Sequence, residues 1–126
     1  MRAVDTNVLV RLIVRDDKAQ QTSAESFVAK GAWVSHLVLA ETVWVLDSVY
    51  GLDRSNLIDA IEMLLSQAVI IFEEPHVVSA ALEHYKKKNS IGFTDCLILE
   101  IARKAGHIPL GTFDKNLSKI GGTQKL

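Results

Sequence analysis

The chain has few of the residues that mark disulfide-bonded or strongly basic proteins. It holds one cysteine and two prolines in 126 residues, and its 14 Lys and Arg face 15 Asp and Glu. A single cysteine excludes an intramolecular disulfide framework, so we expect Cys96 to be a small core residue. The net charge of −1 excludes a histone-like nucleic-acid binder.

Long apolar runs are also absent. The longest stretches without Asp, Glu, Lys or Arg are Gly31–Ala40 and Met63–Phe72, which have ten residues each. A membrane span needs about 20 apolar residues. Asp5 interrupts the N-terminal segment too early for a signal peptide. The sequence therefore predicts a cytoplasmic protein with no membrane span.

Short strand-like segments alternate with longer helical ones along the chain. No repeat, low-complexity stretch or Gly/Pro/Ser-rich linker interrupts them, so we predict one domain over residues 1–126. The alternation favours an α/β sandwich around a mostly parallel sheet. The expected strands are residues 2–5, 32–35, 69–72, 108–112 and 123–126, and the expected helices are residues 7–14, 17–30, 35–50, 57–67, 75–87 and 93–105, with a helical turn at 114–119.

Four acidic residues are expected at one edge of this sheet. Asp5 ends the first strand and Asp114 closely follows Thr112, while Glu41 and Asp95 lie in the early turns of helices. Ligands of open α/β sheets bind at the carboxyl ends of the strands, where these helices also begin. We therefore expect the four carboxylates to converge.

Each acid also has a structural interpretation. Asp5 and Asp114 suit helix N-caps, and Asp95 suits an acid that complements a helix dipole. Glu41 is harder to explain in this way, because its neighbours one turn away are apolar and residues 31–53 hold no Lys or Arg. A buried carboxylate without a partner is very unfavourable, so Glu41 points to pairing, coordination or function.

A divalent cation would relieve the repulsion within such a cluster. Carboxylates without bases raise one another's pKa values, and oxygen donors select Mg²⁺ or Mn²⁺. The four histidines, at positions 36, 76, 84 and 107, lack the spacing of a zinc site. Ions held in this way activate water and steady a leaving oxygen on phosphate substrates.

Four pieces of the sequence resemble the PIN domain, specifically the VapC-type ribonuclease toxins of prokaryotic toxin–antitoxin pairs. They are Asp5–Arg11, Ser35 with Glu41, Phe93–Leu97 and Thr112–Asp114, and together they span nearly the whole chain. The resemblance implies a three-layer α/β/α sandwich with a mostly parallel central sheet. It also implies Mg²⁺-dependent endoribonuclease activity, with Mn²⁺ as a substitute.

The resemblance assigns both catalysis and metal binding to Asp5, Glu41, Asp95 and Asp114. Asn7 and Thr112 match polar positions that support the site by hydrogen bonding, and Thr6 matches the motif or serves the backbone turn.

Other charged residues are open to two interpretations. Arg11 either contacts an RNA phosphate or lies on a solvated face, and Lys86–Lys88 is interpreted as a solvated helix end, with an RNA contact as the alternative. Glu100 lies about 140° around the helix from Asp95, so we do not expect it to join the acids.

Partners also follow from the resemblance. It implies an RNA substrate, a homodimer and a VapB-like antitoxin whose C-terminal segment reaches the acidic site. The segment Leu37–Tyr50 carries more apolar surface than one helix face easily buries, which independently favours self-association. We expect an apolar groove for the antitoxin near Leu9, Leu12, Trp44 and Leu46.

The alternative function is a phosphorelay receiver-type binding module with an acidic pocket. Such a module needs an acidic pair after its first strand and an Asp after its third. This chain has a single Asp5 at the first place and Glu73–Glu74 at the second. We therefore place the metal-dependent ribonuclease ahead of it.

Overall fold

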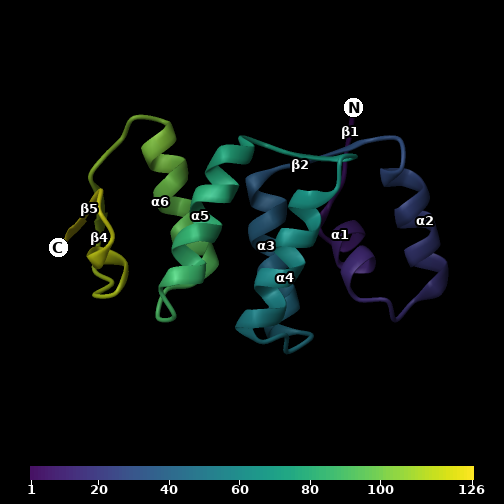
Figure 1. Cartoon of the computed structure of the whole chain (residues 1–126), viewed down its shortest axis with the longest axis horizontal. Helices are drawn as coiled ribbons and strands as arrows, with labels where there is room; N and C mark the ends of the chain where they lie inside the picture. Colours follow the sequence, from purple (N-terminus) through teal and green to yellow (C-terminus); the bar gives the residue numbers. More distant parts are fainter. The chain divides into compact units, whose positions relative to one another are not determined.

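Helices and short parallel strands alternate through residues 1–126, all of which are described in the computed structural model. The chain divides into two compact units, a first unit of Met1–Glu73 and a second unit of Glu74–Leu126 (Figure 1). No helix combines the length and the apolar character that a membrane crossing requires. The prediction of a single domain stays a prediction.

The first unit contains a three-stranded parallel sheet in the order β1-β2-β3. In its register Ala32 pairs with Arg2 on one side and with Ile70 on the other. Figure 1 shows the short strands at one end of the helices. The elements are β1 (Arg2–Ala3), α1 (Thr6–Ile13), α2 (Lys18–Val28), β2 (Ala32–Val34), α3 (His36–Ser48), α4 (Arg54–Ser66) and β3 (Ile70–Phe72).

Side chains on one face of this sheet join the helices in the core. Val34 and Phe72 are buried, and so are Leu39 of α3 and Leu64 of α4. The four consecutive apolar residues 69–72 are typical of a strand that is buried on both faces, but Ile71 points away from the core and is 42% exposed. The short strand alternates in burial because successive side chains of a strand point to opposite faces.

Each helix of the first unit begins at a side-chain N-cap. Asp17 accepts a hydrogen bond from the backbone N–H of Gln20 at 3.0 Å, and Asp53 accepts one from Asn56 at 2.9 Å. Ser35 and Asp5 cap α3 and α1 in the same way. Because a cap satisfies an N–H that has no partner within the helix, these residues fix where the helices start.

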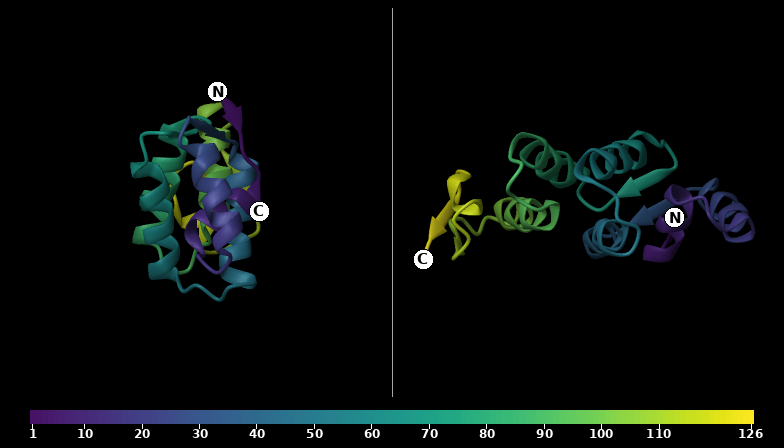
Figure 2. Two further views of the ribbon diagram at one scale, coloured as in Figure 1. Left: turned by 90° about the vertical axis from the view of Figure 1, so that its right-hand side faces the viewer. Right: turned by 90° about the horizontal axis from the view of Figure 1, so that it is seen from below.

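The second unit consists of two helices that pack against each other and a two-stranded parallel sheet. Tyr85 and Phe93 meet edge to face with ring centroids 5.7 Å apart, and Cys96 is fully buried between the helices, as predicted. In the sheet, Leu110 pairs with Thr123. The elements are α5 (Pro75–Lys87), α6 (Phe93–Lys104), β4 (Leu110–Thr112), the 3₁₀ turn η1 (Leu117–Lys119) and β5 (Thr123–Lys125) (Figure 2).

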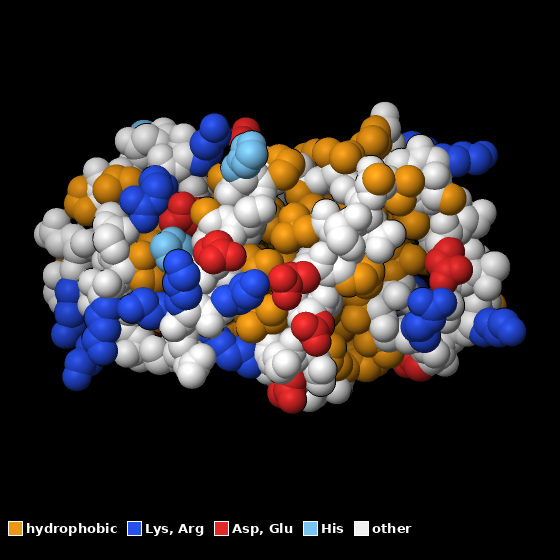
Figure 3. Space-filling view, viewed as in Figure 1, with side chains coloured by type: hydrophobic (Ala, Val, Ile, Leu, Met, Phe, Trp, Pro, Cys, Tyr) orange, Lys and Arg blue, Asp and Glu red, His pale blue; other side chains and the backbone are white.

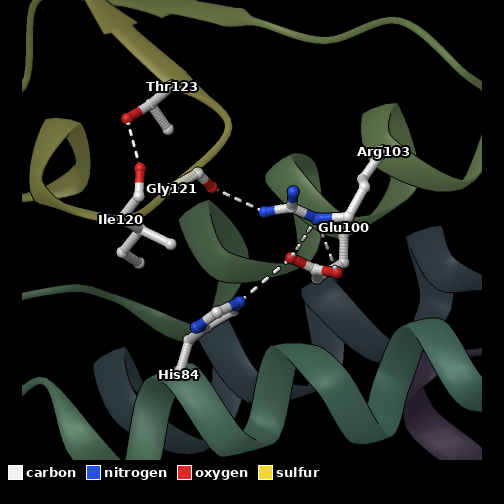
Figure 4. Close-up of polar contacts among 6 residues, drawn as sticks. All are labelled: His84, Glu100, Arg103, Ile120, Gly121 and Thr123. Carbon is white, nitrogen blue, oxygen red and sulfur yellow. Dashed lines mark hydrogen bonds and ion pairs between the residues drawn. The ribbon is translucent and has the colours of Figure 1, made fainter.

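An ionic cluster ties these elements of the second unit together (Figure 4). Glu100, buried on α6, contacts Nε2 of His84 on α5 at 3.0 Å. It also accepts a hydrogen bond from Nε of Arg103 at 3.2 Å, and Nη2 of Arg103 donates to the carbonyl oxygen of Gly121 at 2.6 Å. Glu100 is therefore a structural acid, which explains how a carboxylate is tolerated in the core.

The predicted fold class, an α/β fold with parallel strands, is confirmed, and every expected strand and helix is present. The bounds differ by one to three residues at most ends, because helix ends depend on cap geometry.

The glycine beside this cluster provides a test of it. Gly122 has a φ of +92°, and a Cβ there would lie 2.7 Å from Nη1 of Arg103. Because Arg103 is held by Glu100 and Gly121, we expect Gly122→Ala to lower the free energy of unfolding by roughly 1–2 kcal/mol. Urea unfolding followed by circular dichroism measures this change.

Gly121 is the matched control, because a Cβ there meets nothing within 4 Å and its φ is not positive. We expect Gly121→Ala to unfold nearly as the wild type does. Equal losses in the two variants would contradict the role given to Arg103.

Candidate active site

Asp5 lies where the chain leaves β1 and enters α1. Its Oδ1 accepts the backbone N–H of Val8 at 3.3 Å, which makes Asp5 the N-cap of α1. The residue is exposed, and Oδ2 takes part in no hydrogen bond within the unit. One carboxylate oxygen is therefore used for capping and the other is open to a ligand.

A pocket of about 450 Å³ adjoins Asp5 between α1 and α2. Asn7 lines it together with Arg11, and Thr6, which is half-buried, occupies the first position of α1. These residues place polar groups beside Asp5. Their supporting role in a site stays a prediction.

Arg11 is held within the first unit. Its guanidinium donates to the carboxylate of Asp16 and to the hydroxyl of Tyr50, and its side chain is only 12% exposed. These contacts give Arg11 a structural role between α1, the following loop and the end of α3. The RNA contact suggested for it stays a prediction.

Glu41 lies on α3 but is not buried. Its neighbours one turn away include Leu37 and Trp44, which are 76% and 64% exposed. The apolar neighbours of Glu41 in the sequence predict that this face of the helix is packed in the core. That prediction is wrong, because α3 buries the face that carries Leu39, Thr42, Val43 and Leu46.

The start of α3 is in contact with an acid from elsewhere in the first unit, and the sequence did not reveal the role of this acid. Glu73 follows β3 and its Oε1 accepts the backbone N–H of His36 at 2.8 Å, with the His36 ring nitrogen 3.6 Å away. A carboxylate at a helix N-terminus is favourable for the helix dipole. An acid directly after a buried strand was the available signal, and the receiver alternative had considered it only as a phosphate acceptor.

Two of the predicted acids lie in the second unit and influence each other. Asp95 is in the first turn of α6 and Asp114 follows β4. Partial burial raises the pKa of the Asp95 carboxyl above its ordinary value, and the negative charge of Asp114 raises that pKa further. Neither acid takes part in the ion pairs of this unit.

Asp114 is fixed by its own turn. Its Oδ1 accepts the backbone N–H groups of Asn116 at 2.7 Å and Leu117 at 2.9 Å, and its backbone N–H donates to Oγ1 of Thr112 at 3.0 Å. As at Asp5, one carboxylate oxygen is used locally and the other is left for a ligand.

The donor chemistry of Asp95 and Asp114 fits a divalent cation. They are oxygen donors, their charges repel, and no base neutralises them. Asp5 and Glu41 lie in the first unit, and neither unit on its own gathers three metal-binding side chains. The site of four carboxylates therefore stays a prediction.

The apolar groove that we expect for the antitoxin stays a prediction. Leu9 and Leu46 are buried, whereas Trp44 is 64% exposed. Leu12, in contrast, lines a groove of about 570 Å³ in the first unit, formed with residues of α2, α4 and β3 such as Val28 and Met63.

One family model matches almost the whole chain, and the chain is also similar to a curated relative and to a solved structure. The model of the PIN domain family matches residues 2–123. A VapC ribonuclease of Aquifex aeolicus is 25% identical over 126 residues, which cover 96% of this chain and 93% of the relative. The crystal structure of Mycobacterium tuberculosis VapC20, a sarcin-ricin loop cleaving toxin, matches with a TM-score of 0.45 and 21% identity, over 98% of this chain and 97% of that one.

The raised pKa of Asp95 leads to a prediction about stability. The folded protein holds this proton more tightly than the unfolded chain does, so the stability of the fold falls as pH rises from the ordinary carboxyl range through the folded pKa. In EDTA at pH 7, Asp95→Asn is expected to stabilise the protein by less than about 1 kcal/mol, because solvent screens a partly exposed carboxylate. Urea unfolding at several pH values measures the difference.

The difference between Asp95→Asn and wild type is expected to vanish near pH 3, where both states of the wild type are protonated. A second variant, Asp114→Asn, removes the neighbouring negative charge and is therefore expected to lower the pKa of Asp95. NMR titration of the Asp95 carboxyl measures this pKa. An unchanged Asp95 pKa in Asp114→Asn would show that the two carboxylates do not interact.

Proposed function

The chain belongs to the PIN domain family, and on this premise we propose that it is a metal-dependent endoribonuclease and the toxin of a VapBC-type pair. The main observation behind the proposal is the pair of Asp95 and Asp114. Their carboxylates repel each other and are in no ion pair, which favours the binding of a cation. The similarity to a VapC ribonuclease over almost the whole chain supports the activity and the toxin role.

We propose that Asp5, Glu41, Asp95 and Asp114 together hold Mg²⁺, with Mn²⁺ able to replace it. When bound, the ion lowers the pKa of water and balances charge on phosphate. The carboxylates act as ligands and not as covalent nucleophiles. This requires all four acids to serve one site, and hence residues 1–126 to function as one domain.

The protein's own groups prepare this site. The two N–H donors and Thr112 hold Asp114 in one orientation, so its second oxygen needs no rearrangement to bind an ion. Repulsion from Asp114 disfavours the ionised form of Asp95, and a cation reverses that effect. Asn7 and Thr6 lie beside Asp5, where they support the same site.

We further propose that a VapB-like antitoxin restrains the enzyme in the cytoplasm, where its RNA substrate is found. A disordered segment is suited to cover an apolar groove, and an Arg is suited to pair with carboxylates that would otherwise hold metal. The groove that Leu12 lines with apolar side chains such as Val28 and Met63 is a candidate binding site for such a segment.

A homodimer is proposed through the exposed face of α3. Leu37 and Trp44 place large apolar side chains on the surface beside Glu41. Aromatic side chains of this kind are enriched at protein interfaces.

The nuclease proposal is tested with metal and with single variants. Wild-type protein is expected to cleave single-stranded RNA in Mg²⁺ or Mn²⁺ and to stop when EDTA is added. Asp5→Asn, Glu41→Gln, Asp95→Asn and Asp114→Asn keep side-chain size but remove a ligand charge, so each is expected to reduce kcat/KM by on the order of 100-fold or more. Cleavage is followed by gel electrophoresis of a labelled oligonucleotide.

Asp59→Asn is the control, because Asp59 is an exposed acid of α4 and belongs to none of the four motif pieces. It is expected to cleave as the wild type does. Full activity in EDTA, or equal activity of Asp59→Asn and the four variants, would argue against the metal site.

Self-association is tested by light scattering at micromolar concentration. Trp44→Glu is expected to convert a dimer to a monomer, because it places a charge on the proposed interface. Leu126→Glu is the control, since Leu126 is 63% exposed and Trp44 is 64% exposed. A wild type that is monomeric throughout would exclude the dimer.

A further inference from the structure

Basic residues are divided unevenly between the two units, although the whole chain is nearly neutral. The first unit holds six Lys and Arg against ten Asp and Glu, whereas the second holds eight against five. The first unit is therefore acidic and the second is basic. A polyanion such as RNA is attracted to the second unit and repelled by the first.

Contacts within the first unit strengthen this contrast. Arg2 donates to the carbonyl oxygen of Phe27 and lies over its ring, and Arg15 pairs with Glu25 at 3.0 Å. Arg11 is engaged by Asp16 and Tyr50, as described above. Most bases of this unit are thus arginines that already have partners.

The second unit carries three lysines in the same short segment as Asp114. Lys115 directly follows Asp114, Lys119 ends η1, and Lys125 lies in β5. All three are exposed, and none is in an ion pair. We call them the terminal lysines. In Figure 3, Lys and Arg side chains gather over the part of the surface where β4 and β5 lie.

Local hydrogen bonds hold the terminal lysines near the acid. Because Oδ1 of Asp114 accepts the N–H groups of Asn116 and Leu117, the turn that carries Lys115 has a fixed conformation. The buried side chains of Leu117 and Ile120 anchor η1, so Lys119 is presented from an ordered element. The basic groups therefore flank a candidate metal ligand.

We propose that the terminal lysines bind the phosphate backbone of single-stranded RNA next to Asp114. The inference rests on the proposed nuclease function and adds the surface by which the substrate is held. RNA is the occupant that fits, because a phosphate must reach the metal-binding acids while the carboxylates themselves repel it. Ammonium groups beside Asp114 offset that repulsion without contacting the reacting atoms.

The test compares two variants with the same change in net charge. Lys115→Gln/Lys119→Gln removes two terminal lysines, and Lys18→Gln/Lys30→Gln removes the two exposed lysines of the first unit. Binding of a short fluorescent RNA oligonucleotide is measured by anisotropy in EDTA at several salt concentrations, with gels to verify that the oligonucleotide stays intact.

Each phosphate contact contributes about 0.7 to the slope of log K against log salt for single strands. Loss of two contacts is therefore expected to flatten the slope by about 1.4 in Lys115→Gln/Lys119→Gln, and the control is expected to keep the wild-type slope. In Mg²⁺, the same variant is expected to show a raised KM and a retained kcat, which a general loss of structure would not produce.

Three results would overturn the inference. Equal slopes in the two double variants would show that net charge alone matters. Tighter wild-type binding to poly-glutamate than to an RNA of equal charge would indicate an acidic protein partner. A protein that cleaves RNA while Lys115→Gln/Lys119→Gln binds as tightly as wild type would refute this surface alone, whereas a wild type that neither binds nor cleaves RNA would refute the nuclease proposal itself.

Discussion

The architecture depends on the hydrogen bond between an unpaired helix N–H and a side chain that lies between a strand and a helix. Asp5 lies between β1 and α1 and Ser35 lies between β2 and α3, and each accepts a hydrogen bond from a backbone N–H in the first turn of the helix that follows. Asp114 lies between β4 and η1 and accepts the backbone N–H groups of Asn116 and Leu117. Because an Asp has two oxygens and a cap uses one, the capping interaction fixes a carboxylate in place and still leaves a ligand atom. A capping role and a metal-binding role are therefore compatible at Asp5 and Asp114, although the sequence presented them as alternatives.

Helix α6 shows how position decides the role of an acid. Asp95 and Glu100 lie five residues apart on the same helix, and their environments differ completely. Glu100 contacts His84 of α5 and is paired with the charge of Arg103, so its burial is tolerated. Asp95 lies at the helix start, is partly exposed, and meets the charge of Asp114 instead of a base. Glu100 therefore connects elements of the unit, whereas the negative charge of Asp95 has no positively charged partner in the folded protein. Unbalanced charges of this kind are expected where a cation or a substrate binds.

Much of the fold could be predicted from the sequence, because the alternation of short and long segments and the N-cap residues are local signals. The same local signals put Asp5 and Asp114 after strands and Asp95 in a first turn, where the structure has them. The environment of Glu41 could not be predicted in this way. An apolar helix segment has two faces, and the spacing does not say which of them is packed, so it could not show that Glu41 lies on the surface beside the exposed side chains of Leu37 and Trp44. The cluster of His84, Glu100 and Arg103 was missed for a related reason, since its α5–α6 contact joins residues 16 apart. Whether Asp5 and Glu41 join the other acids depends on long-range placement, which no local pattern encodes.

The proposed function, a nuclease with an acidic centre, involves an electrostatic conflict, which the charge distribution of this chain would reduce. Carboxylates that hold a cation repel the phosphates of the substrate whenever the cation is absent. A uniformly basic protein would avoid this repulsion, but its bases would pair with the acids and compete with the metal. Here Arg11 and Arg15 of the first unit are occupied by partners within it, while the terminal lysines of the second unit are exposed and are in no ion pair. Lysine suits this task because its flexible, hydrated ammonium group attracts phosphate without the bidentate geometry that binds a carboxylate tightly. The near-neutral composition therefore reflects two opposite local charges, and it does not argue against a nucleic-acid substrate.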